Sequence, residues 1–422
     1  MAAVEHTSIP TLLMGIVLIW SVSKFLNIFL DRFKLPGVLG ELFTGLIFGV
    51  LLFLPFENVW GWTWLADKLT FIKNSDILFA LGELGILLLL FEVGLETELD
   101  KITSVGKEAL FVALGGVVAP FLFSWLFSIL FPALHWTVNL VLFIGLVLAA
   151  TSIGVTARVF KDLKVLNTLN AQVVLGAAVI DDIVGLILLS VISALVTTGA
   201  GGVSALMVFI TILKAAVFLG LSAFVGKKVS INVMPWLNKM GKFEPLSLML
   251  WVLCFGFFLA YLADLGGLAP IVGAFAAGVA LDGVRISGLF GETKSIEDFI
   301  APIRAILAPI FFVKVGLAID PSTIFGALPL ILTLIACVSK LISGWVFLPF
   351  KTSLNRLVVG VGMMPRGEVG LVVAAIGNQI GLLTGELYSG VLVAVILTTF
   401  IAPLWLQILL KPRNVKEPKA II

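Results

Sequence analysis

The residues best placed to do chemistry are two adjacent carboxylates, Asp181 and Asp182, in the middle of a long apolar stretch. A carboxylate at the centre of a membrane helix costs roughly 2.5–3.5 kcal/mol on insertion scales, so such residues face a cavity, a bundle interior or a partner. Neighbouring carboxylates disfavour each other's ionisation, which favours proton uptake, and their oxygens suit hard cations such as Na⁺ or Li⁺. The pair therefore predicts a site for a proton or a small alkali cation.

Lys340 lies midway along another apolar segment, which contains no carboxylate of its own. A buried lysine pairs with an acid or loses its proton, so we expect Lys340 to pair with one of the two aspartates. A pair that forms in the empty site and breaks when a cation binds would couple the two events. The alternative is a lysine that only balances charge.

Arg366 and Glu368 follow Pro365 in a further apolar segment. We expect them to compensate helix dipoles and freed backbone groups where broken helices cross, rather than to bind an ion.

The chain as a whole has the composition of a polytopic membrane protein, with 60% hydrophobic and 12% charged residues. A membrane-spanning helix needs about 20 apolar residues, and division at charged or Gly/Pro-rich breaks predicts an all-α domain of thirteen transmembrane helices over residues 1–422. The expected spans lie near 8–30, 36–55, 76–95, 105–131, 138–159, 167–197, 203–226, 244–264, 267–282, 297–318, 324–349, 354–380 and 386–410. A net charge of +2 gives no field for nucleic acid. No cofactor and no soluble regulatory domain are expected.

The basic residues predict the orientation of these spans in the lipid bilayer. With the N-terminus outside, the outer loops hold Lys68 and Lys73, and the inner connections and tail collect most of the other lysines and arginines. Because cytoplasmic loops are enriched in Lys and Arg, the C-terminus is expected in the cytoplasm.

An internal repeat relates the two halves of the chain. LPGVLGELFTG (35–45) is echoed by LAPIVGAFAAG (268–278), and FEVGL (91–95) by VKVGL (313–317). Spans 2–6 thus correspond to spans 9–13, and a shift by an odd number of helices inverts the second copy. Inverted repeats are typical of secondary transporters, whose substrate site lies where discontinuous helices meet.

Two spans have the composition of discontinuous helices. Span 5 has polar residues around Thr151, and span 12 has glycines around Pro365; a simple kink is the alternative for each. Glu92 and Lys314 are equivalent in the repeat, and we expect them to pair across its axis.

Seven motifs carry a family resemblance: LPGVLGELFTGLIFG early in the chain, LAATSIGVTARVFKDL in span 5, GAAVIDDIVGLILL in span 6, APIVGAFAAG in span 9, PIFFVKVG in span 10, SKLISG in span 11 and MMPRGEVGLV in span 12. Together they resemble the sodium/proton antiporters of the monovalent cation:proton antiporter-2 family, over residues 8–410. The resemblance implies the sodium/proton antiporter fold, two broken crossing helices and a homodimer that works by elevator-like alternating access. It also implies a division into a dimerisation subdomain (about 8–100 and 244–318), a core subdomain (about 105–197 and 324–410) and a linker helix (203–226).

The resemblance also implies a role for each residue of the site. Asp182 is implied as the principal carboxylate for Na⁺ and H⁺, Asp181 as a second Na⁺ ligand and the partner of Lys340, and Thr151 as a ligand at the helix crossing. Adjacent aspartates together with the lysine imply electrogenic exchange.

The expected function is therefore antiport of Na⁺ or Li⁺ against H⁺, serving pH homeostasis, across what we expect to be a bacterial plasma membrane. The alternative is K⁺/H⁺ antiport or Kef-like K⁺ efflux, because no motif determines the ion. An intramembrane aspartyl protease would need two aspartates that face each other from different helices. The aspartates here are neighbours on one helix, so no enzyme is expected.

Overall fold

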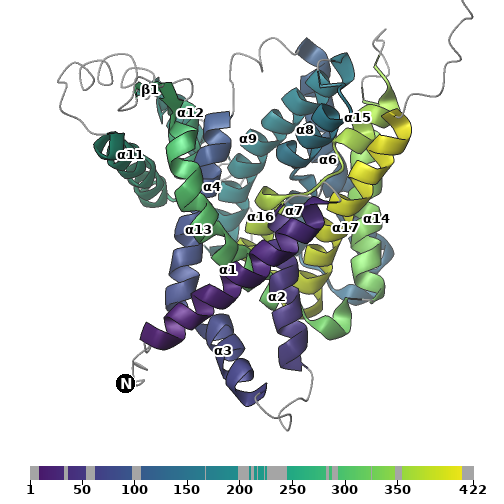
Figure 1. Ribbon diagram of the computed structural model, residues 1–422. Coiled ribbons are helices and arrows are strands. Elements are labelled where there is room, and N and C mark those ends of the chain that lie inside the picture. Colours follow the sequence, from purple (N-terminus) through teal and green to yellow (C-terminus); the bar gives the residue numbers. More distant parts are fainter. Residues whose placement is uncertain are drawn as a thin grey trace, which may run out of the picture.

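The computed structural model describes residues 9–32, 37–53, 62–96, 106–166, 168–197, 245–281, 285–287, 293–324, 326–346 and 354–410, and short helical pieces between 209 and 225. The fold is helical (Figure 1). The helices of the first half are α1 (Ile9–Asp31), α2 (Gly37–Phe53), α3 (Trp62–Asn74), α4 (Asp76–Glu96), α6 (Gly106–Leu130), α7 (Val138–Ala149), α8 (Ile153–Asp162) and α9 (Leu169–Thr197). Those of the second half are α11 (Pro245–Leu265), α12 (Pro270–Ala280), α13 (Ile296–Leu317), α14 (Ala327–Ser343), α15 (Arg356–Gly362), α16 (Glu368–Gln379) and α17 (Gly385–Leu410).

Short elements complete the described chain. The 3-10 turns are η1 (Pro132–Leu134) and η2 (Pro321–Thr323). Strands β1 (Arg285–Ser287) and β2 (Thr293–Ser295) pair antiparallel just before α13, a small ribbon that the sequence did not predict.

Within the residues that the structure describes, six helices are long and apolar enough to cross a membrane: α1, α4, α6, α9, α13 and α17. Shorter apolar helices include α2, α7, α11, α12, α14 and α16. Each expected span contains a described helix, although the structure describes only parts of span 203–226. The chain is an integral, multi-pass membrane protein.

Helix α3 was not expected. Its 13 residues are too few for a span and include Asp67, Lys68 and Lys73, so the apolar pattern gave no signal. Leu69 and Ile72 are nevertheless buried in a hydrophobic cluster with residues of α1, α2, α4 and α13. The packing of these side chains holds the helix.

The helices pack in two groups, each with most of its contacts inside itself. We call the first the α4 group (α1 to α4 and α11 to α13) and the second the α9 group (α6 to α9 and α14 to α17). In Figure 1, α11, α12 and α13 lie at the left, and α14, α15 and α17 lie at the right. The groups meet through apolar side chains such as Phe43 of α2 and Phe400 of α17, whose ring centroids are 5.8 Å apart.

Both predicted helix breaks are present. The first separates α7 from α8 at residues 150–152, and the second separates α15 from α16 at residues 363–367. Pro365 explains the second, because proline lacks the N–H that a helix needs and its ring clashes with the preceding turn.

Candidate ion-binding site

The two breaks lie against each other. The Ser152 N–H in the first break donates to the Pro365 carbonyl in the second at 2.8 Å, and Thr156 Oγ1 donates to the Gly362 carbonyl at 2.8 Å. Irregular backbone at membrane depth is tolerated only where its polar groups find partners in protein or line a cavity. The crossing supplies such partners to both breaks.

Asp181 meets Lys340 and Thr151 beside this crossing. Lys340 Nζ on α14 lies 2.6 Å from Asp181 Oδ2 on α9, and both side chains are fully buried. Thr151 Oγ1, in the first break, donates to the same carboxylate oxygen at 2.9 Å and lies 3.4 Å from the Met363 carbonyl. The structure thus brings three of the predicted site residues into direct contact.

Asp182 follows Asp181 on α9 and is 4% exposed. Consecutive helix residues point about 100° apart, so Asp182 borders the site from a different side. Its charge is close enough to Lys340 to interact with it. Two carboxylates therefore share one buried ammonium.

Asp181 Oδ1 and Ser152 Oγ, both beside the crossing, have no hydrogen-bond partner among the described residues. Buried polar atoms are normally satisfied by protein or ordered water. Carboxylate and hydroxyl oxygens are also the ligands that hard cations prefer. These two atoms are therefore available to a cation or to water.

Arg366 supports the crossing from inside the protein. Its buried guanidinium donates to the carbonyls of Met363 at 3.2 Å, of Met364 at 3.0 Å and of Ala336 on α14 at 3.1 Å. The first two carbonyls follow the C-terminal end of α15, where a positive charge is favourable. The Thr399 hydroxyl on α17 donates to the Arg366 carbonyl. The contacts of Arg366 match its predicted supporting position.

The side chain of Glu368, the other predicted supporting residue, lies outside the described residues.

Gly116 on α6 belongs to the site, although the sequence did not single it out. A Cβ added there would lie 3.0 Å from Lys340 Nζ and 3.3 Å from Asp181 Oδ2. Glycine thus makes room for the ion pair. The Gly115–Gly116 pair in the middle of an expected span was the available signal.

The predicted pairing of Glu92 with Lys314 is wrong. Glu92 on α4 forms an ion pair with Arg304 on α13. Lys314 instead donates to the Ser75 carbonyl at 2.8 Å and lies over the Phe79 ring, 5.4 Å from its centroid. The repeat makes the two positions equivalent, but the packing of α13 on α4 places them at different ends of the helix pair.

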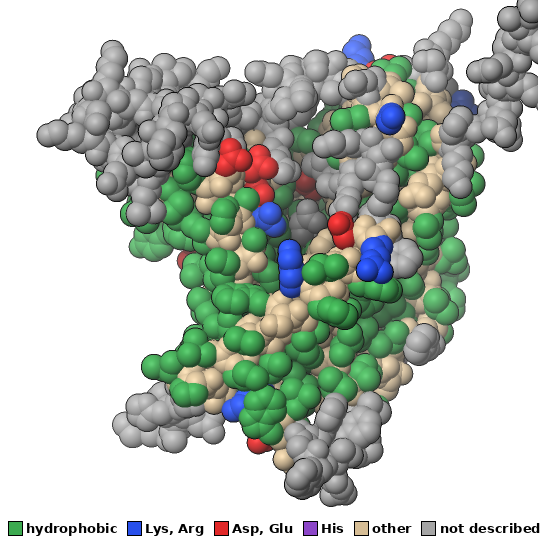
Figure 2. All heavy atoms as spheres, in the orientation of Figure 1, with side chains coloured by type: hydrophobic (Ala, Val, Ile, Leu, Met, Phe, Trp, Pro, Cys, Tyr) green, Lys and Arg blue, Asp and Glu red, His purple; other side chains and the backbone are tan. Residues whose placement is uncertain are grey.

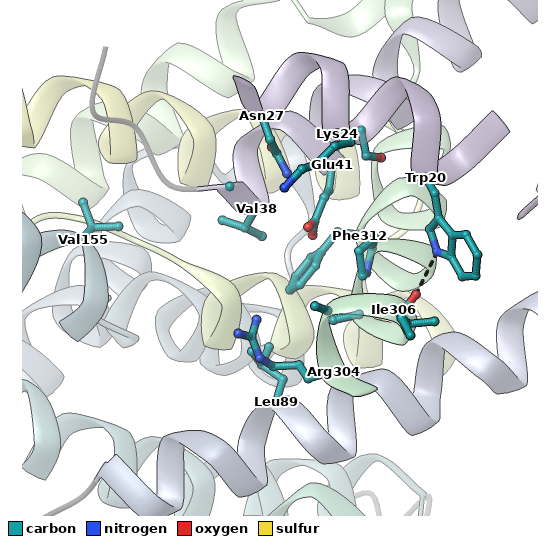
Figure 3. A pocket seen from close by; sticks show the side chains of 15 residues that line it. Trp20, Lys24, Asn27, Val38, Glu41, Leu89, Val155, Arg304, Ile306 and Phe312 are labelled. Atoms are coloured by element: carbon teal, nitrogen blue, oxygen red, sulfur yellow. Dashed lines mark hydrogen bonds between the residues drawn. The ribbon is translucent and has the colours of Figure 1, made fainter. Parts of the chain in front are cut away.

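A cavity of about 500 Å³ lies where the two groups meet, lined by α1, α2, α4 and α13 and by Val155 of α8. Figure 2 shows Lys, Arg, Asp and Glu side chains gathered around a hollow on a face that is otherwise largely hydrophobic. In the close-up, Glu41 and Arg304 point into the cavity, and Trp20 Nε1 donates to the Ile306 carbonyl at its edge (Figure 3). Charged groups therefore line the boundary between the two helix groups.

Comparison with known proteins identifies the family. Residues 15–412 match the transmembrane domain of sodium/hydrogen exchangers. The chain belongs to the sodium/hydrogen exchanger family. This family consists of membrane transporters, so the chain is a transporter and not an enzyme. The resemblance drawn from the motifs is confirmed.

Relatives of this exchanger support the same assignment. It is 35% identical to the high-affinity Na⁺/H⁺ antiporter NhaS3 of Synechocystis, over 94% of this chain and 89% of that protein. It is 34% identical to the Na⁺/H⁺-K⁺ antiporter GerN of Bacillus cereus, over 88% of this chain and 89% of that protein. The sodium proton antiporter MjNhaP1 of Methanocaldococcus jannaschii has a similar fold, with a TM-score of 0.70 at 18% identity, covering 95% of this chain and 98% of that one.

Proposed function

We propose that this chain exchanges Na⁺ or Li⁺ for H⁺, and that cation and proton compete for Asp182. The observation that carries the proposal is the buried cluster at the helix crossing, where Asp181, Lys340 and Thr151 are in contact and Asp182 lies beside them. Relatives named Na⁺/H⁺ antiporters support the choice of ions.

The charge of the cluster supplies a reason for exchange. Among the described side chains of the site, Asp181 and Asp182 are offset by Lys340 and Arg366, so the buried charges cancel when all four are ionised. An added cation would leave an uncompensated positive charge in a low-dielectric space, which is costly. If Asp182 holds a proton before the cation enters, release of that proton as Na⁺ binds leaves the net charge of the cluster unchanged and avoids the cost.

Lys340 is the proposed link between the two ions. When the site is empty, Lys340 pairs with Asp181; when Na⁺ binds, Asp181 and the Thr151 hydroxyl turn toward the cation and the pair breaks. If Lys340 then loses its proton, two protons exchange for one Na⁺ and the cycle moves charge. Exchange in proteoliposomes whose rate or direction changes with the membrane voltage supports this electrogenic cycle. Exchange that is indifferent to voltage overturns it.

The principal test uses purified protein in proteoliposomes with an imposed pH gradient. Addition of Na⁺ is expected to collapse the gradient, and Asp182→Asn is expected to abolish the response because the neutral amide cannot hold the proton or compensate the cation. Lys107→Gln changes a charge at an exposed position near the start of α6 and serves as the matched control. An unaltered response in Asp182→Asn removes Asp182 from its proposed role.

Potassium is the second candidate ion, because one relative is named a Na⁺/H⁺-K⁺ antiporter. The same gradient assay with K⁺ in place of Na⁺ separates the two. Collapse by K⁺ alone would replace the Na⁺ proposal by K⁺/H⁺ exchange.

We also propose the inverted repeat, with thirteen spans in all. Support comes from two glycine crossings that the repeat makes equivalent: Gly45 of α2 packs on α13 at Gly316, and Gly278 of α12 packs on α4 at Gly94. A Cβ on Gly45 would clash with the Val313 carbonyl, and one on Gly278 with the equivalent Phe91 carbonyl. Gly45→Ala and Gly278→Ala should therefore lower the melting temperature by similar amounts, and clearly unequal losses count against the repeat.

The two helix groups support the proposed elevator. In this proposal the α4 group forms the dimer interface, and the α9 group is the core that carries the ion site across the bilayer of the bacterial plasma membrane, with the C-terminus in the cytoplasm. Light scattering of the detergent-purified protein tests the dimer, and labelling of a C-terminal tag in intact cells tests the orientation. A monomer, or a tag labelled from outside, contradicts the respective part.

A further inference from the structure

A proline in the middle of α6 leaves one backbone carbonyl without its helical partner. The proline is Pro120, with ten residues of α6 after it. In an α-helix the residue at this position donates its N–H to the carbonyl of the residue four places earlier, which here is Gly116. Proline has no N–H, and its ring clashes with that same carbonyl. The Gly116 carbonyl is therefore free of the helical hydrogen-bond ladder.

Gly116 is also the residue at which α6 lies against the ion pair. Helix α6 packs on both α9 and α14, and a Cβ on Gly116 would lie 3.0 Å from Lys340 Nζ and 3.6 Å from Asp181 Oδ1. The Gly116 carbonyl oxygen lies about 2.4 Å from the same Cα by standard bond lengths. Both Gly116 and Pro120 are buried. A small rotation of the Lys340 side chain can thus bring Nζ to this carbonyl.

Lys340 has N–H groups to spare for such an acceptor. An ammonium carries three donors, and Asp181 Oδ2 accepts from Nζ at 2.6 Å. Within the described part of the chain, Nζ makes no second hydrogen bond. Carbonyls freed by proline in membrane helices are satisfied by neighbouring helices, hydroxyl groups or water. Lys340, on the neighbouring helix α14, is a donor that can satisfy the Gly116 carbonyl.

We infer that the Gly116 carbonyl, kept free by Pro120, receives Lys340 when a cation displaces the lysine from Asp181. The inference rests on the proposed function, in which Na⁺ binding breaks the pair of Lys340 and Asp181. Nζ pairs with Asp181 in the empty site and turns to the carbonyl when Na⁺ is bound. A charged and a neutral amine both donate N–H, so the carbonyl serves Lys340 whether or not the lysine loses its proton. Without this acceptor the displaced amine would be buried without a partner, which is costly.

Pro120 is thus a positioning residue, and the test restores the N–H that it lacks. Pro120→Ala supplies a donor that returns the Gly116 carbonyl to the helical ladder. The matched control has lactic acid, the ester analogue of alanine, in place of Pro120, because this residue has the same methyl group and no N–H. A net hydrogen bond changes an equilibrium by about two- to tenfold. We expect Pro120→Ala to raise the Na⁺ concentration that half-collapses the pH gradient by that factor, and the lactic acid variant to stay near the parent.

Two further variants separate the N–H from other effects of losing a proline. Pro120→Val supplies the same N–H while filling more of the space of the ring, and the same rise is expected. Pro309→Ala restores a helical N–H at a buried proline of α13 in the α4 group and should leave the sodium dependence near that of the parent. Equal sodium dependence of the alanine and lactic acid variants at position 120 overturns the inference.

A double-mutant cycle shows which group uses the carbonyl. Na⁺ binding to the detergent-purified protein is measured by calorimetry, with the alanine and lactic acid variants each combined with Lys340→Met. If the carbonyl receives Lys340, the difference between the two variants disappears when the amine is absent. A difference that persists means that the carbonyl binds Na⁺ itself or acts through the shape of α6, and it overturns the inference.

Failure of the inference and failure of the proposed function give different results. A parent protein in which Na⁺ does not collapse the pH gradient overturns the antiport proposal. A parent that exchanges ions, with the same sodium dependence in both variants at position 120, overturns the role of the Gly116 carbonyl and leaves antiport intact.

Discussion

Two ion pairs between neighbouring helices of the described part of the chain differ in their access to water. Lys340 and Asp181 are fully buried at the helix crossing. Arg304 and Glu92 lie beside the large cavity, where the Arg304 side chain keeps 31% of its accessible surface. Removal of charge from water is costly unless a partner compensates it. Each member of the first pair therefore depends on the other, whereas Arg304 can also be stabilised by water.

This difference separates a pair that can respond to a transported ion from one that cannot. Where water reaches an ion pair, it can solvate the side chain that an arriving cation displaces. Breaking such a pair then changes the free energy little, so the pair hardly responds to the cation. Where water is excluded, a cation or proton is the available substitute for the partner. The enclosed pair meets that condition, and the pair at the cavity serves to hold α4 and α13 together.

The largest expected difference between the pairs is in stability. Asp181→Ala should lower the free energy of unfolding by about 3–5 kcal/mol, because Lys340 is left buried without its partner. Glu92→Ala, the matched control, should cost about 1 kcal/mol or less, because Arg304 can turn to the cavity. Unfolding of the purified protein in detergent measures both, and equal losses would remove the distinction.

The removal of both enclosed charges sharpens the same point. Asp181→Leu combined with Lys340→Met should recover most of the stability that Asp181→Ala loses, since neither member of this pair is then left buried without the other. A double variant as unstable as the single one would mean that packing, and not charge, carries the loss.

A smaller effect is expected at Arg366. Arg366→Lys keeps the positive charge but cannot reach all three carbonyls that the guanidinium contacts. Unsatisfied buried acceptors cost about 1–3 kcal/mol, and the same unfolding assay should show a loss in that range. Arg304→Lys is the control at the cavity. It should lower the free energy of unfolding less, because water can bind the polar groups that the shorter side chain no longer reaches. Equal losses would imply that the crossing is as accessible to water as the cavity.

Gly116 tests how closely the enclosed pair is fitted. In Gly116→Ala the methyl group would lie 3.0 Å from Lys340 Nζ, so the pair must shift by a few tenths of an ångström. We expect a loss of about 1 kcal/mol and a several-fold rise in the Na⁺ concentration that half-collapses the pH gradient. Gly220→Ala has no neighbour within 4 Å and should leave both quantities nearly unchanged. No change in sodium dependence would show that the pair adapts freely.

The smallest expected effect is the salt dependence of the two pairs. Raising choline chloride from about 0.05 to 0.5 M shortens the screening length to a few ångströms. The stability difference between the parent and Glu92→Ala should shrink by a few tenths of a kcal/mol, whereas the difference for Asp181→Ala should stay constant. Equal shrinkage would indicate that solvent ions reach the crossing.

The sequence predicted the breaks and the members of the site because their physical signals are local. Pro365 ends a helix wherever it stands in one, and Asp181, Asp182 and Lys340 are costly in any membrane helix. These residues could be selected without knowledge of their neighbours, and the structure places them together.

The choice of partners could not be predicted in the same way. The charge argument allowed either aspartate as the partner of Lys340, and only the family resemblance implied Asp181. The direction of the Asp181 side chain on α9, next to Thr151 and Gly116, is what makes it the partner. For Glu92 the repeat suggested Lys314, but the offset of α13 along α4 brought Arg304 to it instead. Helix α3 was missed because its apolar residues are few and depend on burial against other helices.

By itself, the sequence determined that this chain is a multi-pass membrane transporter with a buried acid pair, a buried lysine and two interrupted helices. These properties follow from the free-energy cost of placing charged side chains and unpaired backbone groups in a bilayer. Each segment incurs that cost whatever its neighbours in the fold are. The tertiary structure decided that Lys340 pairs with Asp181 and that Arg366 binds the carbonyls at the crossing. Contacts of a few ångströms depend on how whole helices are rotated and offset against each other, and no single segment contains that information.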